Sequence, residues 1–271
     1  MRKLMRWIAV AVFLFAAVML VRDALSSRRE RAAYAALAQE MHAAEQAASV
    51  SSPTPGGQPA APAQADAPAQ PADPGERAIL PQFVSLHERN EDMAGWLTME
   101  AIGVDHPVMY TPEDQNYYSH AAFNHELNVG GALFLGVPWG DETRHSIIYG
   151  HNLTDGSMFG HLKLYEDEAF GRAHPVITFY TLYEKREYTL VCAYIGQVYH
   201  ADDTENFHYY AYPDLSDPEK FTEFVNGVMD LALYTLEPAP EYGDELLTLS
   251  TCEKATGSSP GRFVLLAKRI S

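Results

Sequence analysis

Two side chains with complementary chemistry lie at the ends of apolar strands. Residues 246–252 end in Cys252, and residues 262–266 begin with Arg262 and continue as an apolar run. The segment between them carries Gly, Ser and Pro, which favour a turn. We therefore expect an antiparallel hairpin that brings Cys252 and Arg262 to the same rim of a sheet. A thiol beside a fixed cation is a candidate nucleophile, because the positive charge favours the thiolate.

His151 is the candidate proton donor. It follows an apolar strand predicted over residues 146–149 and a glycine, so it also lies at a strand end. Arg262 cannot act as a base at ordinary pH, so we expect it to hold an oxyanion or the backbone of a substrate. A thiol, an imidazole and a guanidinium together suit covalent acyl transfer.

At these residues the chain resembles the sortases, the cysteine transpeptidases of Gram-positive cell surfaces. The resemblance covers roughly residues 80–271, and its motifs occur in the family's order. The motifs are GWL at 95–97, DHPVM at 105–109, NYYSHAAFN at 116–124, YGHN at 149–152, GSMFGHL at 156–162, TLSTC at 248–252 and the arginine at 262. A long helix expected before the closing hairpin makes class B the subclass that the chain resembles.

The resemblance implies catalytic roles for Cys252, His151 and Arg262. It also implies that three neighbouring residues belong to the substrate groove, namely Tyr149, Ser250 and Glu253. The implied substrates are surface proteins or pilins with a C-terminal sorting signal, which is cleaved after threonine through a thioester. The implied acceptor is an amine of peptidoglycan or of a pilin lysine, and no cofactor is needed. The sequence leaves open whether the product is a wall-anchored protein or a pilus.

Two other functions remain open at this point. The chain could be a membrane-tethered binding or scaffold protein that keeps the fold without turnover, or a hydrolytic cysteine protease that uses the same groove. Cys192 lies in the middle of an apolar strand, so we expect a free core thiol there. An aromatic cluster is equally compatible with packing and with a groove wall, and it comprises Phe207, Tyr209, Tyr210 and Tyr212. The histidines show no metal-ligand spacing, so no metal is expected.

The charge distribution argues against nucleic acid as a partner. The chain has 271 residues and a net charge of −17. Residues 1–34 hold seven Lys and Arg against two acidic side chains, which leaves the remainder with 12 basic and 34 acidic residues. Such an acidic body repels nucleic acid.

Composition divides the chain into four predicted segments. Residues 1–23 read as a cytoplasmic tip and a transmembrane signal anchor around the apolar run 7–21. Residues 24–48 are rich in Ala, Glu and Arg and favour a juxtamembrane helix. Residues 49–76 read as a Pro/Ala-rich linker, and residues 77–271 as the catalytic domain. The predicted location is therefore the cell membrane, with a single pass, the N-terminus in the cytoplasm and the catalytic domain outside, as the resemblance implies.

The predicted fold is mainly β. Short apolar strands separated by turn residues suggest a barrel or a sandwich, and the resemblance implies a closed eight-stranded barrel with N-terminal helices and a long helix between strands 6 and 7. A capping box at 216–219 starts that helix, and its expected buried stripe is Phe221, Phe224, Val225, Val228 and Ala232. Besides the hairpin, the expected strands are 96–99, 104–109, 132–135, 146–149, 176–180 and 188–195.

Overall fold

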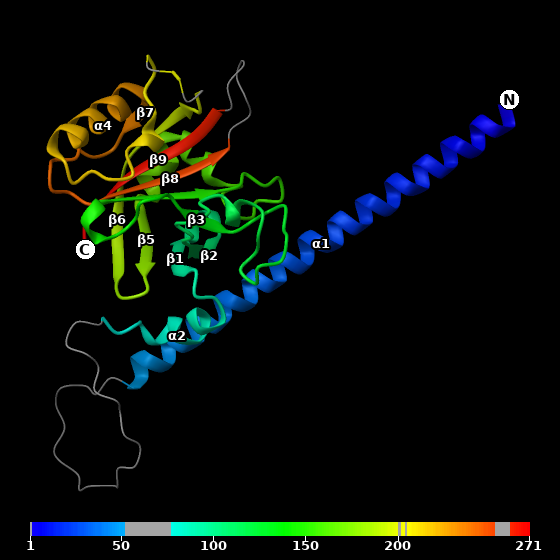
Figure 1. Ribbon diagram of the computed structural model, residues 1–271, viewed down its shortest axis with the longest axis horizontal. Coiled ribbons are helices and arrows are strands. Elements are labelled where there is room, and N and C mark those ends of the chain that lie inside the picture. The colour runs from blue at the N-terminus through cyan, green and yellow to red at the C-terminus, as the bar shows by residue number, and fades with distance from the viewer. Residues whose placement is uncertain (1, 52–76, 200–201, 204, 253–260) are drawn as a thin grey trace, which may run out of the picture.

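The computed structural model of the chain describes residues 2–51, 77–199, 202–203, 205–252 and 261–271. A β-barrel forms the body, and a long N-terminal helix lies against it and extends away from it (Figure 1). Within the described residues there are nine strands. They are β1 (Met93–Met99), β2 (Val104–Met109), β3 (Leu133–Leu135), β4 (His145–Gly150), β5 (Val176–Thr181), β6 (Lys185–Gln197), β7 (Ala232–Thr235), β8 (Leu246–Cys252) and β9 (Gly261–Arg269).

Hydrogen bonds close eight of these strands into a ring. The order in the sheet is β5-β1-β2-β3-β4-β8-β9-β6-β7, and an additional pairing of β5 with β6 closes all strands except β7. The pairs β2–β3 and β4–β8 are parallel, whereas the others are antiparallel. The prediction of a closed eight-stranded barrel is thereby confirmed. Closure leaves no exposed edge in the ring.

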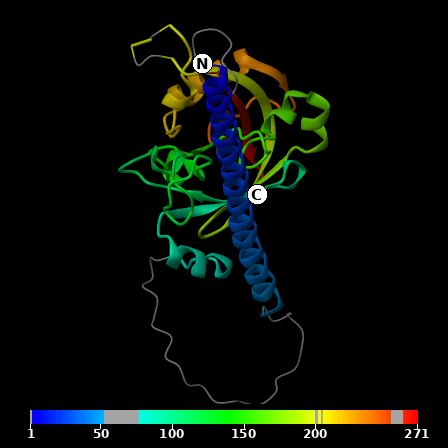
Figure 2. The same ribbon diagram turned by 90° about the vertical axis from the view of Figure 1, so that its right-hand side faces the viewer.

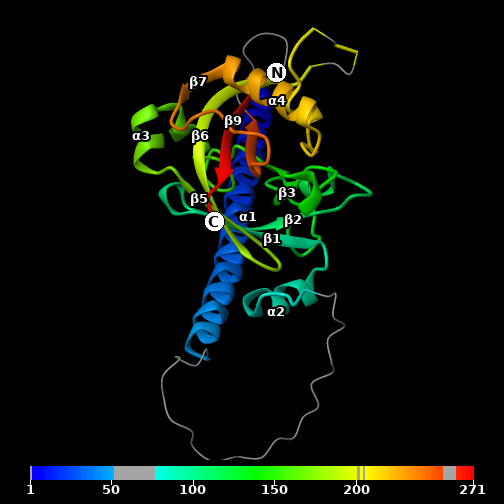
Figure 3. The same ribbon diagram turned by 90° about the vertical axis from the view of Figure 1, so that its left-hand side faces the viewer.

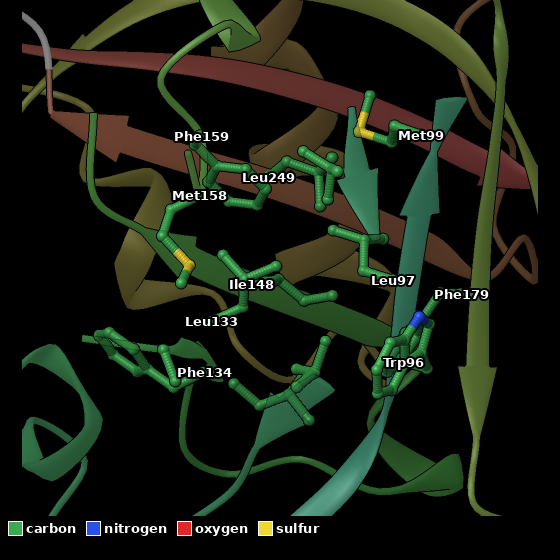
Figure 4. Close-up of a cluster of buried hydrophobic side chains, with 14 of the residues drawn as sticks. Trp96, Leu97, Met99, Leu133, Phe134, Ile148, Met158, Phe159, Phe179 and Leu249 are labelled. Atoms are coloured by element: carbon green, nitrogen blue, oxygen red, sulfur yellow. The ribbon is translucent and has the colours of Figure 1, made fainter. Parts of the chain in front are cut away.

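The barrel interior is filled by apolar side chains from facing strands. Trp96 and Leu97 of β1, Ile148 of β4 and Leu249 of β8 are at most 2% exposed, and Figure 4 shows them with Phe159 and Phe179 in one cluster. Burial of such large side chains is the main favourable contribution to folding. This core holds in place the strand ends where the candidate site lies.

An α-helix of about four turns lies between β6 and β8, which are the sixth and seventh of the predicted strands, as predicted. It is α4 (Pro218–Leu231), and the Asp217 carboxylate caps it by accepting from the backbone N–H groups of Glu219 and Lys220. Phe221, Phe224, Val225 and Val228 are buried in a second apolar cluster on the outer side of β6 and β9. The predicted stripe extended to Ala232, but this residue has extended backbone angles and begins β7 instead.

The remaining helices are short. Two are α-helical, α2 (Pro81–Arg89) and α3 (Glu168–Ala173). The 3₁₀ turns are η1 (Glu100–Ile102), η2 (Tyr117–Ser119), η3 (Asp141–Thr143), η4 (Leu162–Glu166) and η5 (Tyr209–Ala211). Figure 3 shows α2 at the end of the barrel beside α1, on the side away from α4.

The N-terminal helix α1 (Arg2–Ser51) is continuous over 50 residues. Its second half packs on the barrel, where Tyr34, Leu37 and Met41 are at most 6% exposed and belong to the main apolar core. Figure 1 shows its first half extending beyond the barrel, and in the view of Figure 2 the helix passes in front of the barrel. The helix therefore crosses the predicted boundaries after residues 23 and 48 without a break. Of the predicted linker 49–76, residues 49–51 belong to this helix, and residues 52–76 lie outside the described residues.

The prediction of a single-pass membrane protein with a cytoplasmic N-terminus is wrong. Among the residues that the structure describes, no helix is long and apolar enough to cross a membrane. The apolar run from 7 to 21 has 15 residues, with Arg6 before it and Arg22 after it. At about 1.5 Å per residue it is about 22 Å long, which is shorter than a hydrocarbon core of about 30 Å.

Candidate active site

The closing hairpin sets Cys252 opposite Arg262. The antiparallel register of β8 and β9 pairs Thr251 with Phe263 and Cys252 with Arg262, at the end of the hairpin where the connection between the two strands begins. The predicted pairing of the two strands is therefore confirmed. The side chain of Cys252 and all of Glu253 lie outside the described residues, as does the rest of the connection to residue 260.

His151 follows directly on the strand that flanks β8. The parallel register of β4 and β8 pairs Tyr149 with Ser250 and Gly150 with Thr251. One residue further along both strands come His151 and Cys252. The sequence thus brings His151, Cys252 and Arg262 to adjacent ends of β4, β8 and β9, because these three strands are neighbours in the ring.

A cavity of about 340 Å³ opens at these strand ends. Four of the predicted site residues line it, namely Tyr149, His151, Ser250 and Arg262. The lining residues to which the sequence analysis gave no site role are Gln115, Asn116, Ser119, Phe134, Gly150, Val198 and Thr251. Asn116 and Ser119 fall inside one of the quoted motifs, which is the one signal that could have identified them.

The imidazole of His151 is held by a main-chain carbonyl. Its Nε2 lies 2.8 Å from the carbonyl oxygen of Ser119. A carbonyl can only accept, so Nε2 carries the hydrogen in this bond. Nδ1 is then the ring nitrogen that can take up and release a proton. The ring of His120 stacks nearby, with ring centroids 6.5 Å apart.

Arg262 presents a half-buried guanidinium to the cavity. One of its nitrogens donates to the carbonyl of Gly261 at 3.1 Å. In the described part of the chain, no carboxylate forms an ion pair with it. Five fixed donors and a permanent charge suit stabilisation of a developing oxyanion.

Tyrosines form the wall next to Ser250. The Ser250 Oγ and the Tyr209 hydroxyl oxygen are 2.7 Å apart in a buried hydrogen bond. Burial raises the pKa of Tyr149 well above its ordinary value, although the charge of Arg262 opposes the shift. The Tyr149 hydroxyl therefore stays protonated and can serve as a hydrogen-bond donor.

The aromatic cluster divides between the two expected roles. Tyr209 and Tyr210 line the cavity, whereas the rings of Phe207 and Tyr212 pack at a tilt against Phe224 of α4. Cys192 is a free, fully buried thiol whose pKa is raised by burial to about 12. Such a thiol is inert at neutral pH, so it does not compete with Cys252 as a nucleophile.

The described residues contain no group of three His, Cys, Asp or Glu side chains arranged to hold a metal ion. The arrangement at the cavity instead combines an imidazole, a guanidinium and the backbone position of a cysteine. These are the groups for nucleophilic attack on a carbonyl, for stabilisation of the oxyanion and for proton transfer to a leaving amine.

Comparisons with known proteins agree on one family. No protein-family model matches the chain. The chain is 29% identical over 195 residues to Sortase B of Listeria monocytogenes. The matched region covers 71% of this chain and 76% of that protein. It is 27% identical over 194 residues to Sortase B of Staphylococcus aureus, with the same coverage.

Solved structures show the same fold. A Staphylococcus aureus sortase B–substrate complex matches with a TM-score of 0.70 at 22% identity, over 91% of this chain and 99% of that one. Sortase B from B. anthracis in complex with AAEK1 matches with a TM-score of 0.67 at 24% identity, over 91% of this chain and 99% of that one.

Proposed function

Because the chain belongs to the sortase family, in its class B, we propose that it is a transpeptidase that cleaves a C-terminal sorting signal after threonine. Residues 77–271 form the catalytic domain. The substrates are surface proteins or pilins, and the acceptor is an amine of peptidoglycan or of a pilin lysine. The observation that supports this proposal best is the register that pairs Cys252 with Arg262 while His151 and Arg262 line one cavity.

The first half-reaction forms a thioester. The Cys252 thiolate attacks the carbonyl carbon of the substrate threonine, and the electron pair of the C=O bond moves onto oxygen. Arg262 stabilises this oxyanion. The C–N bond then breaks, and the His151 imidazolium gives its proton to the departing amine. Tyr149, Ser250 and Glu253 complete the groove that holds the peptide.

The second half-reaction transfers the acyl group. Neutral His151 removes a proton from the incoming amine, whose nitrogen attacks the thioester carbonyl. The C–S bond breaks and the Cys252 thiolate is regenerated, so no cofactor is consumed. Water competes as a nucleophile. The Ser119 carbonyl keeps Nε2 protonated throughout, so each proton is exchanged at Nδ1.

The test uses quenched fluorogenic peptides in which every residue except one threonine is varied. The wild-type protein should cleave at least one peptide, and an added amine such as hydroxylamine should raise the rate. Cys252→Ala should abolish cleavage and the thioester seen by mass spectrometry, whereas Cys192→Ala, the matched control, should retain both. Arg262→Ala should lower kcat/KM by at least about 10²-fold, which is typical for the loss of one oxyanion donor.

Three outcomes would contradict the proposal. Cleavage that no amine accelerates would identify a hydrolytic cysteine protease. A folded wild-type protein that binds peptides but forms no thioester would be a binding or scaffold protein. Cleavage that survives in Cys252→Ala would place the nucleophile elsewhere.

A further inference from the structure

The N-terminal helix makes a buried hydrogen bond to the turn before β3. The hydroxyl of Tyr34 on α1 donates to the carbonyl oxygen of Gly131 at 2.9 Å. The Tyr34 side chain is 6% exposed, and its ring packs edge-on against His106 of β2 with 5.1 Å between ring centroids. A bond so deeply buried fixes the position of the turn relative to the helix.

Gly131 in turn lies directly on the backbone of η2. A Cβ at this position would be 2.5 Å from the carbonyl oxygen of Tyr118 and 2.9 Å from that of Ser119. Its φ of 59° is in the left-handed region that favours glycine. The next residue, Ala132, donates its N–H to the Tyr118 carbonyl at 2.9 Å. The turn and the carbonyls of residues 118 and 119 therefore form one closely packed unit.

The same unit holds the candidate catalytic histidine. The carbonyl of Ser119 accepts the hydrogen bond from Nε2 of His151 at 2.8 Å. The contacts thus run from Tyr34 to Gly131, from Gly131 to Ser119, and from Ser119 to the imidazole. They connect α1 to the end of β4 through two backbone segments that leave no room for a side chain between them.

The loop after His151 also borders α1. Leu153, Gly156 and Met158 line, together with residues of α1, a cavity of about 480 Å³. Arg31 of α1 forms an ion pair with Asp155 of this loop at 3.5 Å. The loop returns to the histidine, because the N–H of Phe159 donates to the His151 carbonyl at 3.0 Å. The turn at Gly131 and the loop after His151 therefore both contact α1, and each is also linked to His151.

We propose that Tyr34 is a positioning residue for His151. By fixing Gly131, and through it the Ser119 carbonyl, Tyr34 keeps the hydrogen of the imidazole on Nε2 and directs Nδ1 towards the reacting groups. Tyr34 touches no reacting atom, and it acts only through the backbone segments that lie between it and His151. The effect of Tyr34 on catalysis rests on the proposed function, whereas its effect on the orientation of the His151 imidazole does not.

The test compares two tyrosines that join α1 to the barrel. Tyr34→Phe removes the hydroxyl that contacts Gly131. Tyr180→Phe is the matched control, because the Tyr180 hydroxyl donates to Glu45 of α1 at 3.0 Å but lies on β5, away from His151. Tyr34→Phe should lower kcat by at least about tenfold with little change in KM, since a misplacement of about 1 Å can cost about 10²-fold. Tyr180→Phe should leave kcat close to the wild-type value.

A second readout does not depend on turnover. NMR of nitrogen-labelled histidine reports which ring nitrogen carries the hydrogen, and the His151 signals can be assigned by their loss in His151→Gln. At a pH at which the His151 ring is neutral, the wild-type protein and Tyr180→Phe should show the Nε2–H form, whereas Tyr34→Phe should show a substantial population of the Nδ1–H form. Thermal melts identify a temperature at which all variants are folded.

Either of two results would overturn the proposal. One is a His151 spectrum in Tyr34→Phe that is identical to that of the wild type, and the other is the same kcat in both tyrosine variants. A wild-type protein that turns over no peptide would instead contradict the proposed function. In that case the NMR comparison alone decides whether Tyr34 positions His151.

Discussion

His145 forms hydrogen bonds from the start of β4, the strand that His151 follows, to two other segments of the chain. It is the first residue of β4 and is 2% exposed. Its Nδ1 lies 2.6 Å from the carbonyl oxygen of Tyr212, and its Nε2 lies 2.8 Å from the hydroxyl oxygen of Thr248. Since the carbonyl can only accept, Nδ1 donates and Nε2 accepts from the hydroxyl. Burial lowers the pKa of His145 to about 4, although the bond to Tyr212 opposes the shift.

This buried histidine predicts a loss of stability in mild acid. The unfolded chain binds a proton at His145 near pH 6.5, whereas the folded protein does not until about pH 4. Between these values the unfolded state binds more protons, so the free energy of unfolding falls as the pH falls. His145→Asn keeps a donor for Tyr212 but cannot titrate. Wild type should be the more stable at pH 7, and urea denaturation should show this advantage shrink by about 2 kcal/mol at pH 5. A constant difference at the two pH values would contradict the argument.

Residue types and spacing predicted one part of the candidate site and not another. Tyr149, His151, Ser250 and Arg262 could be found because each has a distinctive side chain next to the end of an apolar strand. Ser119 contributes a main-chain carbonyl, and any residue type supplies that group. Its contact with His151 depends on how segments 32 residues apart pack, which no local pattern records.

At the scale of elements, the closure of the barrel depends on close contact between β1 and β5. Gly95 of β1 pairs with Thr181 of β5, and a Cβ at Gly95 would collide with the carbonyl oxygen of Tyr180. This carbonyl belongs to the backbone of the neighbouring strand, so a methyl group cannot be accommodated by a side-chain movement. The Gly-Trp-Leu motif therefore has a structural explanation in the sheet itself.

Gly95→Ala should lower the free energy of unfolding by about 3 kcal/mol, which is the upper range for overpacking a well-packed site. Gly103→Ala is the matched control. Gly103 has a φ of 69° but nothing lies within 4 Å of its Cβ position, so that variant carries only the backbone strain of about 1 kcal/mol. Urea denaturation followed by tryptophan fluorescence measures both. Equal losses of stability in the two variants would show that the contact with Tyr180 is not the reason why a side chain is unfavourable at residue 95.

The apolar pattern predicted most elements but not all of their ends. The strand predicted over 188–195 is β6, which starts earlier at Lys185, because Arg186 is buried through ion pairs with Asp141 and Glu184 rather than through apolar contact. The strand β7 was missed entirely. Ala232 continues the helical spacing of α4, and four residues are too few to show an alternating pattern.

At the scale of the whole molecule, α1 joins the barrel as part of its core. Residues 24–48 read as an Ala-, Glu- and Arg-rich helix, and this composition does not distinguish a helix in solvent from one packed on a domain. The helical spacing of Tyr34, Leu37 and Met41 is the signal that could have identified the packed face. Ion pairs and hydrogen bonds accompany this face, such as His42 with Asp105 at 2.8 Å and Arg89 with Glu40 at 2.7 Å.

Two methionines on α1 separate its packed half from the half that extends away. Met41 is 0% exposed and belongs to the same apolar cluster as Phe83 and Leu86 of α2, whereas Met19 is 40% exposed. Met41→Ala should lower the free energy of unfolding by about 2–5 kcal/mol, because it leaves a cavity in the core. Met19→Ala should change it by less than about 0.5 kcal/mol, as is usual for a surface position. Since both replacements remove the same atoms from the same helix, the difference measured by urea denaturation reports only the contact with the barrel. Similar values for the two would mean that α1 does not fold as one unit with the barrel, and the route from Tyr34 to His151 would then lack its starting point.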